Sequence, residues 1–190
     1  MGYFDHEENV EAYIKMADGY DGAELIALLR RYLPEGSSVL ELGMGPGKDL
    51  DLVRQFYRVT GSDTSRVFLD RYRNNHPEAD LLLLDATRMD TDRTFDGIYS
   101  NKVLHHLTRE ALTTSLRRQK AVLNDGGLAL HTFWYGAGDD EHHGLRFTYY
   151  TEPDLRAAVC DGFDVVALES YQEMTDGDSL YLLLRKTHDR

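Results

Sequence analysis

The sequence is poor in cysteine, proline and long apolar runs, and each shortage excludes a class of protein. It has one cysteine, Cys160, and four prolines among 190 residues. A lone cysteine cannot form an internal disulfide, which argues against a disulfide-stapled secreted scaffold. Apolar runs such as Leu81–Leu84 fall far short of the roughly 20 residues in a membrane-spanning helix. The first residues lack the apolar core of a signal peptide, so we expect a cytoplasmic protein.

Basic residues are also scarce. Lysine and arginine total 21 against 33 aspartates and glutamates, which gives a net charge of −12 with neutral histidines. Proteins bind nucleic acids mainly through the phosphates, so this charge disfavours DNA or RNA as a partner. We therefore expect a small-molecule substrate, no nucleic acid and no membrane insertion. The sequence leaves the oligomeric state open, a homodimer included.

The sequence does contain a regular alternation of short apolar runs and helical patterns. Five runs read as buried strands, at 37–43, 57–63, 79–86, 95–101 and 128–134. Helical patterns lie between them at 47–56, 65–76 and 103–123, and two strands, 163–171 and 179–186, end the pattern. This alternation predicts an α/β fold with a parallel sheet and helices on both faces. Ligands bind such sheets at the carboxyl ends of the strands, where we expect the site.

A glycine-rich loop follows the first of these strands. It runs Glu41-Leu42-Gly43-Met44-Gly45-Pro46-Gly47-Lys48, and the next helix begins near Gly47. Glycines allow a tight turn and let a ligand approach the backbone, while free N–H groups at a helix start suit an anionic group. Taken alone, the loop is weak evidence for a ligand, because an ordinary tight turn between strand and helix also explains it.

Acidic residues end the next two strands. Asp63, 18 residues after Gly45, is placed to accept hydrogen bonds from ribose hydroxyls, and Asp85-Ala86 lies where an adenine edge is expected. A nicotinamide dinucleotide and S-adenosylmethionine both fit this arrangement. The dinucleotide pattern G-x-G-x-x-G needs a small residue at position 48, where Lys48 stands. The spacing therefore favours S-adenosylmethionine.

The loop from Glu41 to Gly47 resembles the first motif, E/D-x-G-x-G-x-G, of the class I S-adenosylmethionine-dependent methyltransferases. The branch it most resembles is the small-molecule one that includes the ubiquinone and menaquinone C-methyltransferases. Segments 61–65, 84–86 and 123–127 are similar to later motifs of the family, although Asp125 replaces a proline. The resemblance implies a Rossmann-like, seven-stranded, mostly parallel sheet in the order 3-2-1-4-5-7-6, with strand 7 antiparallel. It also implies a single domain over residues 1–190, with helices in 1–35 covering the cofactor site.

The same resemblance implies a set of cofactor contacts. The glycine loop would hold the amino-acid end of S-adenosylmethionine. The second motif would hold its ribose, and the third motif would hold its adenine. The residues after the fourth strand and the N-terminal helices would add further contacts. The expected cofactor-binding residues are Tyr20, Glu41, Gly43, Met44, Gly45, Asp63, Thr64, Asp85, Ala86, Ser100 and Asn101.

Methyl transfer from a sulfonium needs positioning rather than a nucleophilic side chain, and we expect no metal. His105 is the expected general base, with His106 as an alternative and helix-start packing as a plain structural explanation. The stretch 135–150 carries glycines at both ends and reads as a lid over the site. Substrate contacts are expected from Tyr13, Trp134, Arg146 and Tyr150.

The sequence thus predicts an enzyme that transfers a methyl group to carbon, nitrogen or oxygen of a small acceptor and releases S-adenosylhomocysteine. Adenine or amide nitrogens are disfavoured, because Ser100-Asn101-Lys102-Val103 lacks the N/D-P-P-Y/F pattern of those enzymes. Two alternatives stay open. One is a cofactor-binding or regulatory protein of this fold without turnover, and the other is an NAD-dependent oxidoreductase, against which Lys48 argues.

Overall fold

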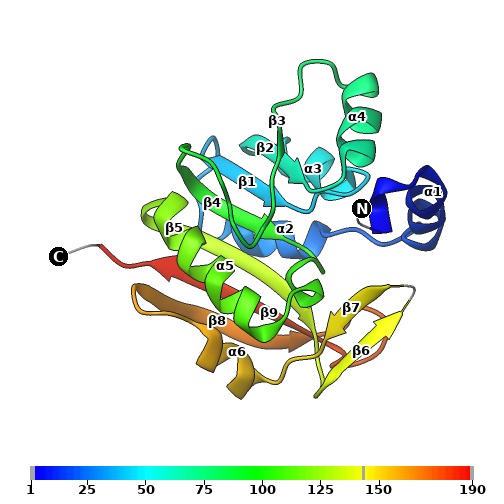
Figure 1. Cartoon of the computed structure of the whole chain (residues 1–190). Helices are drawn as coiled ribbons and strands as arrows, with labels where there is room; N and C mark the ends of the chain where they lie inside the picture. Colours follow the sequence, from blue (N-terminus) through cyan, green and yellow to red (C-terminus); the bar gives the residue numbers. More distant parts are fainter. Residues whose placement is uncertain (1–2, 143, 189–190) are drawn as a thin grey trace.

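A seven-stranded sheet in the order β3-β2-β1-β4-β5-β9-β8 forms the centre of the molecule (Figure 1). The computed structural model describes residues 3–142 and 144–188. Neighbouring strands are parallel except at β9, which runs antiparallel to both β5 and β8. Since β6 and β7 form a separate hairpin, this is the predicted order 3-2-1-4-5-7-6, and the α/β fold class is confirmed. The strands are β1 (Ser38–Leu42), β2 (Arg58–Asp63), β3 (Leu81–Leu83), β4 (Phe95–Ser100), β5 (Leu123–Trp134), β6 (Asp139–His142), β7 (Leu145–Thr148), β8 (Phe163–Tyr171) and β9 (Ser179–Lys186).

Serine and threonine caps set where several helices begin. The side chains of Ser65, Thr108 and Thr151 each accept a hydrogen bond from the backbone N–H three residues further on, which satisfies an otherwise unpaired donor. Within the described ranges, no helix is both long and apolar enough to cross a membrane. The helices are η1 (Tyr3–Asp5), α1 (Glu7–Met16), α2 (Ala23–Arg30), α3 (Lys48–Val53), α4 (Arg66–Asn75), η2 (Leu104–His106), α5 (Arg109–Val122) and α6 (Glu152–Ala158).

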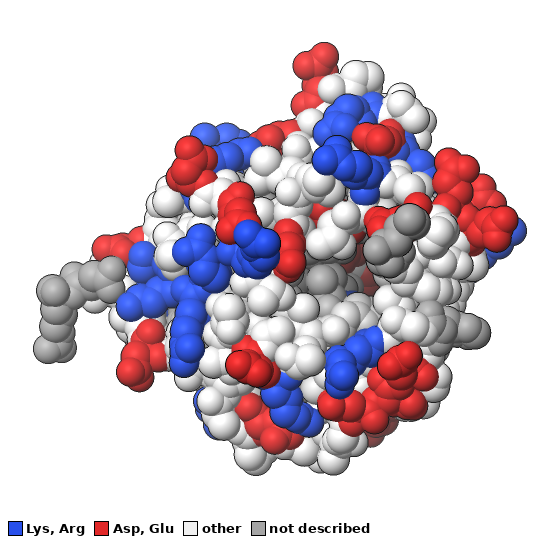
Figure 2. All heavy atoms as spheres, in the orientation of Figure 1, with Lys and Arg blue, Asp and Glu red and all other residues white. Residues whose placement is uncertain are grey.

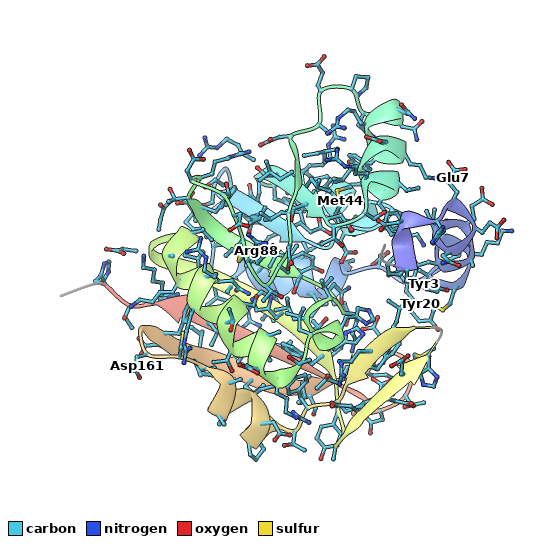
Figure 3. All side chains as sticks on the ribbon, in the orientation of Figure 1. Tyr3, Glu7, Tyr20, Met44, Arg88 and Asp161 are labelled. Atoms are coloured by element: carbon cyan, nitrogen blue, oxygen red, sulfur yellow. The ribbon has the colours of Figure 1, made fainter. Side chains whose placement is uncertain are left out.

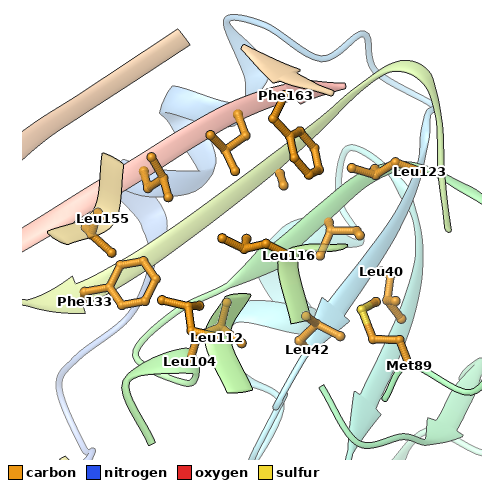
Figure 4. Close-up of a cluster of buried hydrophobic side chains, with 14 of the residues drawn as sticks. Leu40, Leu42, Met89, Leu104, Leu112, Leu116, Leu123, Phe133, Leu155 and Phe163 are labelled. Atoms are coloured by element: carbon orange, nitrogen blue, oxygen red, sulfur yellow. The ribbon is translucent and has the colours of Figure 1, made fainter. Parts of the chain in front are cut away.

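Two apolar layers hold the sheet between its helices, because alternate residues of a strand point to opposite faces. In β9, Leu182 and Leu184 belong to the core under α5 and α6, whereas Leu183 belongs to the core under α2. Figure 4 shows the first layer, where Leu112 and Leu116 of α5 pack beside the strands. Packing in both cores holds the strands in place, and with them the carboxyl ends at which the site lies.

Three element boundaries differ from the sequence prediction. The helix expected over 103–123 is split: η2 forms first, and α5 starts at Arg109 because Thr108 caps it. The expected turn at 124–127 lies inside β5, where Gly126 has φ 75° and the register with β4 shifts. The stretch expected as a lid loop is a β-hairpin, β6–β7, next to η2 (Figure 1). His143 of that stretch, like 1–2 and 189–190 of the expected domain, lies outside the described residues.

The N-terminal segment folds over the carboxyl ends of the strands. The Phe4 ring packs 5.4 Å from Phe68 of α4 and 5.3 Å from Tyr13 of α1, measured between ring centroids. An ion pair of 3.7 Å between Glu11 and Arg71 adds to this contact. The segment therefore rests on α4 through an aromatic cluster and not through the central sheet.

Candidate active site

Two adjoining cavities lie over the carboxyl ends of β1, β2, β3 and β4. The larger, about 300 Å³, runs from the N-terminal segment to the β6–β7 hairpin, and the smaller, about 120 Å³, lies between the segment after α1 and the glycine loop. They share four lining residues, Tyr13, Gly43, Gly45 and Lys102. We call the two together the strand-end cleft. In Figure 2 the surface is hollowed between the α1 region and the hairpin, with acidic side chains at the margin.

Backbone geometry explains the glycines of the loop after β1. Gly43, Gly45 and Gly47 have φ values of 63°, 51° and 88°, in the left-handed region that favours glycine. A Cβ at Gly43 would lie 2.5 Å from a methyl of Val103. At Gly45 the space is open, with its nearest atom on Tyr13 at 3.7 Å, so the backbone faces the cleft. Met44 is buried in a small core with Tyr72 while also lining the smaller cavity; it is labelled in Figure 3.

Asp63 at the end of β2 joins the loop to the cleft. Its two carboxylate oxygens accept hydrogen bonds from the backbone N–H groups of Gly45, at 2.9 Å, and Ser65, at 2.8 Å. Burial raises the pKa of Asp63, and these backbone donors oppose the rise. The carboxylate and Thr64 both line the larger cavity. Asp63 is thus held rigidly, with lone pairs left for a ligand that donates hydroxyl hydrogens.

The third-motif residues line the far side of the same cavity. Asp85 follows β3, and its Oδ1 accepts a hydrogen bond from Thr87 N at 2.7 Å. Ala86 lies next to it, and Leu84 supplies an apolar wall. An apolar wall with a hydrogen-bond acceptor beside it suits a heteroaromatic ring that carries an amino group.

The smaller cavity contains an unpartnered carboxylate. Glu41 is 4% exposed, and its Oε2 atom has no hydrogen-bond partner within the described structure. Burial raises its pKa well above the usual value, and the nearby Asp49 and Asp63 add to the rise. A buried acceptor without a donor is costly unless a ligand supplies one. An ammonium group would supply it and favour the ionised carboxylate.

Asp49 organises this end of the cleft. Its carboxylate accepts hydrogen bonds from Gly22 N (2.7 Å), the Tyr99 hydroxyl (2.7 Å) and Asn101 Nδ2 (3.1 Å). Asn101 in turn accepts from the Thr132 hydroxyl at 2.7 Å. One buried carboxylate therefore ties the start of α2 to β4 and β5. Sequence reasoning missed Asp49, which no motif marks and whose partners lie 27 to 52 residues away.

The two N-terminal tyrosines lie at different depths. Tyr13 lines both cavities, and burial raises its pKa. Tyr20, labelled in Figure 3, is 44% exposed and lines the smaller cavity. Tyr13 therefore lies where the cavities meet, and Tyr20 lies at the outer edge.

Ser100, expected at the cofactor, belongs to a buried hydrogen-bond chain. It is 0% exposed, and its hydroxyl lies 2.7 Å from His131 Nδ1. His131 Nε2 lies 2.7 Å from Gln119 Oε1, so the ring donates from Nε2 and accepts from Ser100 at Nδ1. Burial lowers the pKa of His131 to about 3. This chain joins β4, β5 and α5 beneath the cleft, and its side chains do not line it.

The two neighbouring histidines also separate. His105 is 2% exposed, and neither ring nitrogen has a partner in the described structure. Burial lowers its pKa well below the usual value, with His106 and Lys102 adding to the effect. His106, not His105, lines the larger cavity, and its Nδ1 lies 2.7 Å from the Arg146 carbonyl oxygen. Of the pair, His106 is the one placed to reach a ligand.

Lys102, which the sequence left without a role, stands at the junction of the two cavities. Its Nζ donates to the Phe133 carbonyl (3.0 Å) and the Ser179 hydroxyl (2.6 Å). It also lies 3.6 Å from the centre of the Trp134 ring. Burial lowers the Lys102 pKa to about 8. Trp134 therefore contacts the cleft through this lysine.

Two expected substrate residues point elsewhere. Arg146 pairs with Asp139 across the hairpin at 3.0 Å, with its side chain 43% exposed. Tyr150 is 1% exposed and packs 5.1 Å from Phe133, with its hydroxyl unpartnered among the described residues. Neither lines the strand-end cleft.

Comparison with known proteins finds similarity to methyltransferases. Residues 39–127 match the model of a methyltransferase domain. A dTDP-3-amino-3,6-dideoxy-alpha-D-glucopyranose N,N-dimethyltransferase of Streptomyces fradiae is 31% identical over 60% of this chain and 47% of its own length. A trans-aconitate 2-methyltransferase of Delftia acidovorans is 26% identical over 89% of this chain and 66% of its own length. The chain thus spans less than two thirds of these curated relatives.

Solved structures agree on the fold. The 1,6-didemethyltoxoflavin-N1-methyltransferase of Burkholderia thailandensis, solved with S-adenosylhomocysteine, superposes with a TM-score of 0.76 at 24% identity, over 96% of this chain and 87% of its own. The matched segment 39–127 includes the glycine loop, Asp63 and Asp85. Residues 39–127 are thus similar to a methyltransferase domain, and the chain shares the fold of a solved methyltransferase over nearly its whole length.

Proposed function

We propose that this protein is an S-adenosylmethionine-dependent methyltransferase that acts on a small molecule. The observation that supports the proposal is the strand-end cleft, because carboxylates suited to a nucleoside and to an amino acid line its two parts. Asp63 and Asp85 line its larger part, and Glu41 lies in its smaller part. The unpartnered Oε2 of Glu41 fits the ammonium of the cofactor.

When bound, S-adenosylmethionine supplies a methyl group on a positively charged sulfur, ready for in-line displacement. The residues of this chain would then position the reactants and exclude water. Asp63 would accept the ribose hydroxyls, Asp85 the adenine amino group, and Glu41 the ammonium. Tyr13 lies where the two cavities meet, and its ring face would attract a cation. His106 lines the cleft and would take a proton where the acceptor has to lose one.

Calorimetric titration with S-adenosylhomocysteine tests the proposal, with NAD as the parallel ligand. We expect micromolar binding of S-adenosylhomocysteine and none of NAD. Binding of NAD instead would move the protein to the oxidoreductases, and binding of neither would refute the cofactor assignment. Incubation with S-adenosylmethionine and a metabolite pool, followed by mass spectrometry, then separates an enzyme from a cofactor-binding protein without turnover.

The location of the protein in the cell and its partners are part of the same proposal. Its one cysteine and its net charge of −12 support a cytoplasmic protein that binds neither nucleic acid nor membranes. Light scattering at micromolar concentration distinguishes a monomer from the homodimer that the sequence leaves open.

A further inference from the structure

A third cavity opens beside the strand-end cleft. It has a volume of about 450 Å³ and lies between the start of α2 and the turn that joins β8 to β9. Three acids, Asp21, Glu24 and Glu173, and three tyrosines, Tyr20, Tyr171 and Tyr181, line it. None of its lining residues is basic. We call it the α2 groove.

The α2 groove is continuous with the smaller cavity of the cleft. Tyr20, Asp21 and Glu173 line both. That smaller cavity holds the unpartnered carboxylate of Glu41 and meets the larger one at Tyr13 and Lys102. A molecule in the groove can therefore reach the junction where, under the proposed function, the methyl group would lie.

The cation at that junction is already engaged. The Nζ of Lys102 is hydrogen-bonded to the Phe133 carbonyl and the Ser179 hydroxyl, and it lies against the face of Trp134. The Tyr171 ring centre, from the groove wall, is 5.4 Å from the same Nζ. This corner of the molecule thus holds an ammonium between aromatic faces. Lys48, the other lysine that lines the smaller cavity, donates to the Ala17 carbonyl at 2.7 Å and lies 3.4 Å from Asp18.

We propose that the methyl acceptor is a basic amine that enters through the α2 groove. Its ammonium would lie among Asp21, Glu24 and Glu173, and its carbon skeleton against the tyrosine rings. The proposal rests on the proposed function and names its substrate class. It separates this chain from a tricarboxylate methyltransferase, because an anionic acceptor would face the three acids of the groove, while the lysines further in, Lys48 and Lys102, already have partners.

The chemistry balances for an amine. The bound ammonium first gives a proton to a groove carboxylate and from there to water. The lone pair of the neutral nitrogen then forms the new N–C bond. The S–C bond breaks with its electron pair going to sulfur, which leaves S-adenosylhomocysteine and a methylated ammonium. That ammonium then loses its proton to a groove carboxylate and from there to water.

A matched pair of probes tests the proposal. Tyramine and 3-(4-hydroxyphenyl)propanoate share a phenol and a two-carbon arm but carry opposite charges. Each is titrated by calorimetry into protein saturated with S-adenosylhomocysteine, so cofactor binding is measured first and on its own. We expect tyramine to bind at least tenfold more tightly. Equal affinities, tighter binding of the carboxylate, or no binding of tyramine would overturn the amine assignment while leaving the cofactor result untouched.

Variants then locate the binding. In Glu24→Gln/Glu173→Gln, we expect the Kd of tyramine to rise at least fivefold. In Glu24→Gln alone, whose side chain lines the α2 groove and neither cavity of the strand-end cleft, we expect the Kd of S-adenosylhomocysteine to stay within twofold. Glu152→Gln removes one negative charge, as Glu24→Gln does, but from an exposed position on α6, and should change neither constant. If tyramine bound the double variant as tightly as the parent, the groove would not be its site. Glu24→Gln alone, at an exposed helix position, keeps the test valid if the double variant folds poorly.

Discussion

Asp63 is the residue on which cofactor recognition should depend most. Both its oxygens are already fixed by backbone N–H groups, so the carboxylate meets a ribose without reorganising. We expect Asp63→Asn to weaken S-adenosylhomocysteine binding by about 1–3 kcal/mol, the range for hydrogen bonds to a charged group. Calorimetry measures the change, with the exposed Asp92→Asn as a control of equal charge. Unchanged affinity in Asp63→Asn would refute the ribose assignment.

The buried chain of Ser100, His131 and Gln119 predicts a pH dependence of stability. The pKa of His131 is about 3 when folded and about 6.5 when unfolded. Between these values the unfolded chain binds a proton that the folded chain does not, so stability falls as the pH drops from about 6.5 towards 3. His105, also lowered, contributes with the same sign.

Urea unfolding between pH 5 and 7 checks this dependence. His131→Gln should reduce the slope of the unfolding free energy against pH by up to about 1.4 kcal/mol per pH unit. A His131 variant with the parent slope would show that this imidazole does not stay neutral in the fold.

Residues were predictable where spacing along the chain carries the signal. Glu41 and Asp63 stand at the carboxyl ends of β1 and β2, Asp85 follows β3, and all three line the cleft. Asp49 has no such marker, because its partners come from Gly22, Tyr99 and Asn101. Neighbouring positions are also hard to predict: His105 is buried, whereas His106, the next residue, lines the larger cavity. Such choices depend on packing that no local pattern records.

At the scale of elements, substituting a glycine in the loop after β1 should lower the free energy of unfolding. Gly43→Ala should destabilise the fold in two ways. A non-glycine residue in the left-handed region costs about 1–2 kcal/mol, and overpacking against Val103 costs about 1–3 kcal/mol. We expect a loss of about 2–5 kcal/mol in unfolding free energy, measured in urea. Gly138→Ala, with φ 84° and open space around its Cβ, should carry only the backbone cost. Adding Val103→Ala should recover part of the loss at Gly43; no recovery would contradict the packing explanation.

The β6–β7 hairpin shows the limit of prediction for elements. Its glycines and charges predicted a lid loop, and a run of acidic residues gives no strand signal, yet Asp139–His142 pairs with Leu145–Thr148. The pairing satisfies backbone groups that a loop would leave to water. The strands of the main sheet were predicted because burial selects apolar runs, whereas all four residues of β6 are exposed.

The hairpin and the N-terminal segment should respond together to the cofactor. Leu145 and Tyr3 both line the larger cavity, so a ligand there bridges two elements that the central sheet does not hold. We expect S-adenosylhomocysteine to slow amide hydrogen exchange in 3–17 and 145–148 and to leave α6 unchanged. Slower exchange in α6 alone, or no change in either segment, would show that these elements do not close over the site.

For the whole molecule, cofactor binding should appear as thermal stability. A ligand that binds only the folded chain stabilises it by about 2.7 kcal/mol at 100 times its Kd. For a domain of this size, each kcal/mol raises Tm by about 2–4 °C, so S-adenosylhomocysteine should raise it by about 5–10 °C. NAD at the same concentration should give no shift. Around the cleft, the N-terminal segment meets the ends of the four parallel strands and the hairpin. Deleting residues 1–17 should therefore reduce the Tm shift caused by S-adenosylhomocysteine much more than it lowers the Tm of the free protein. An equal shift after that deletion would mean that the sheet alone holds the cofactor.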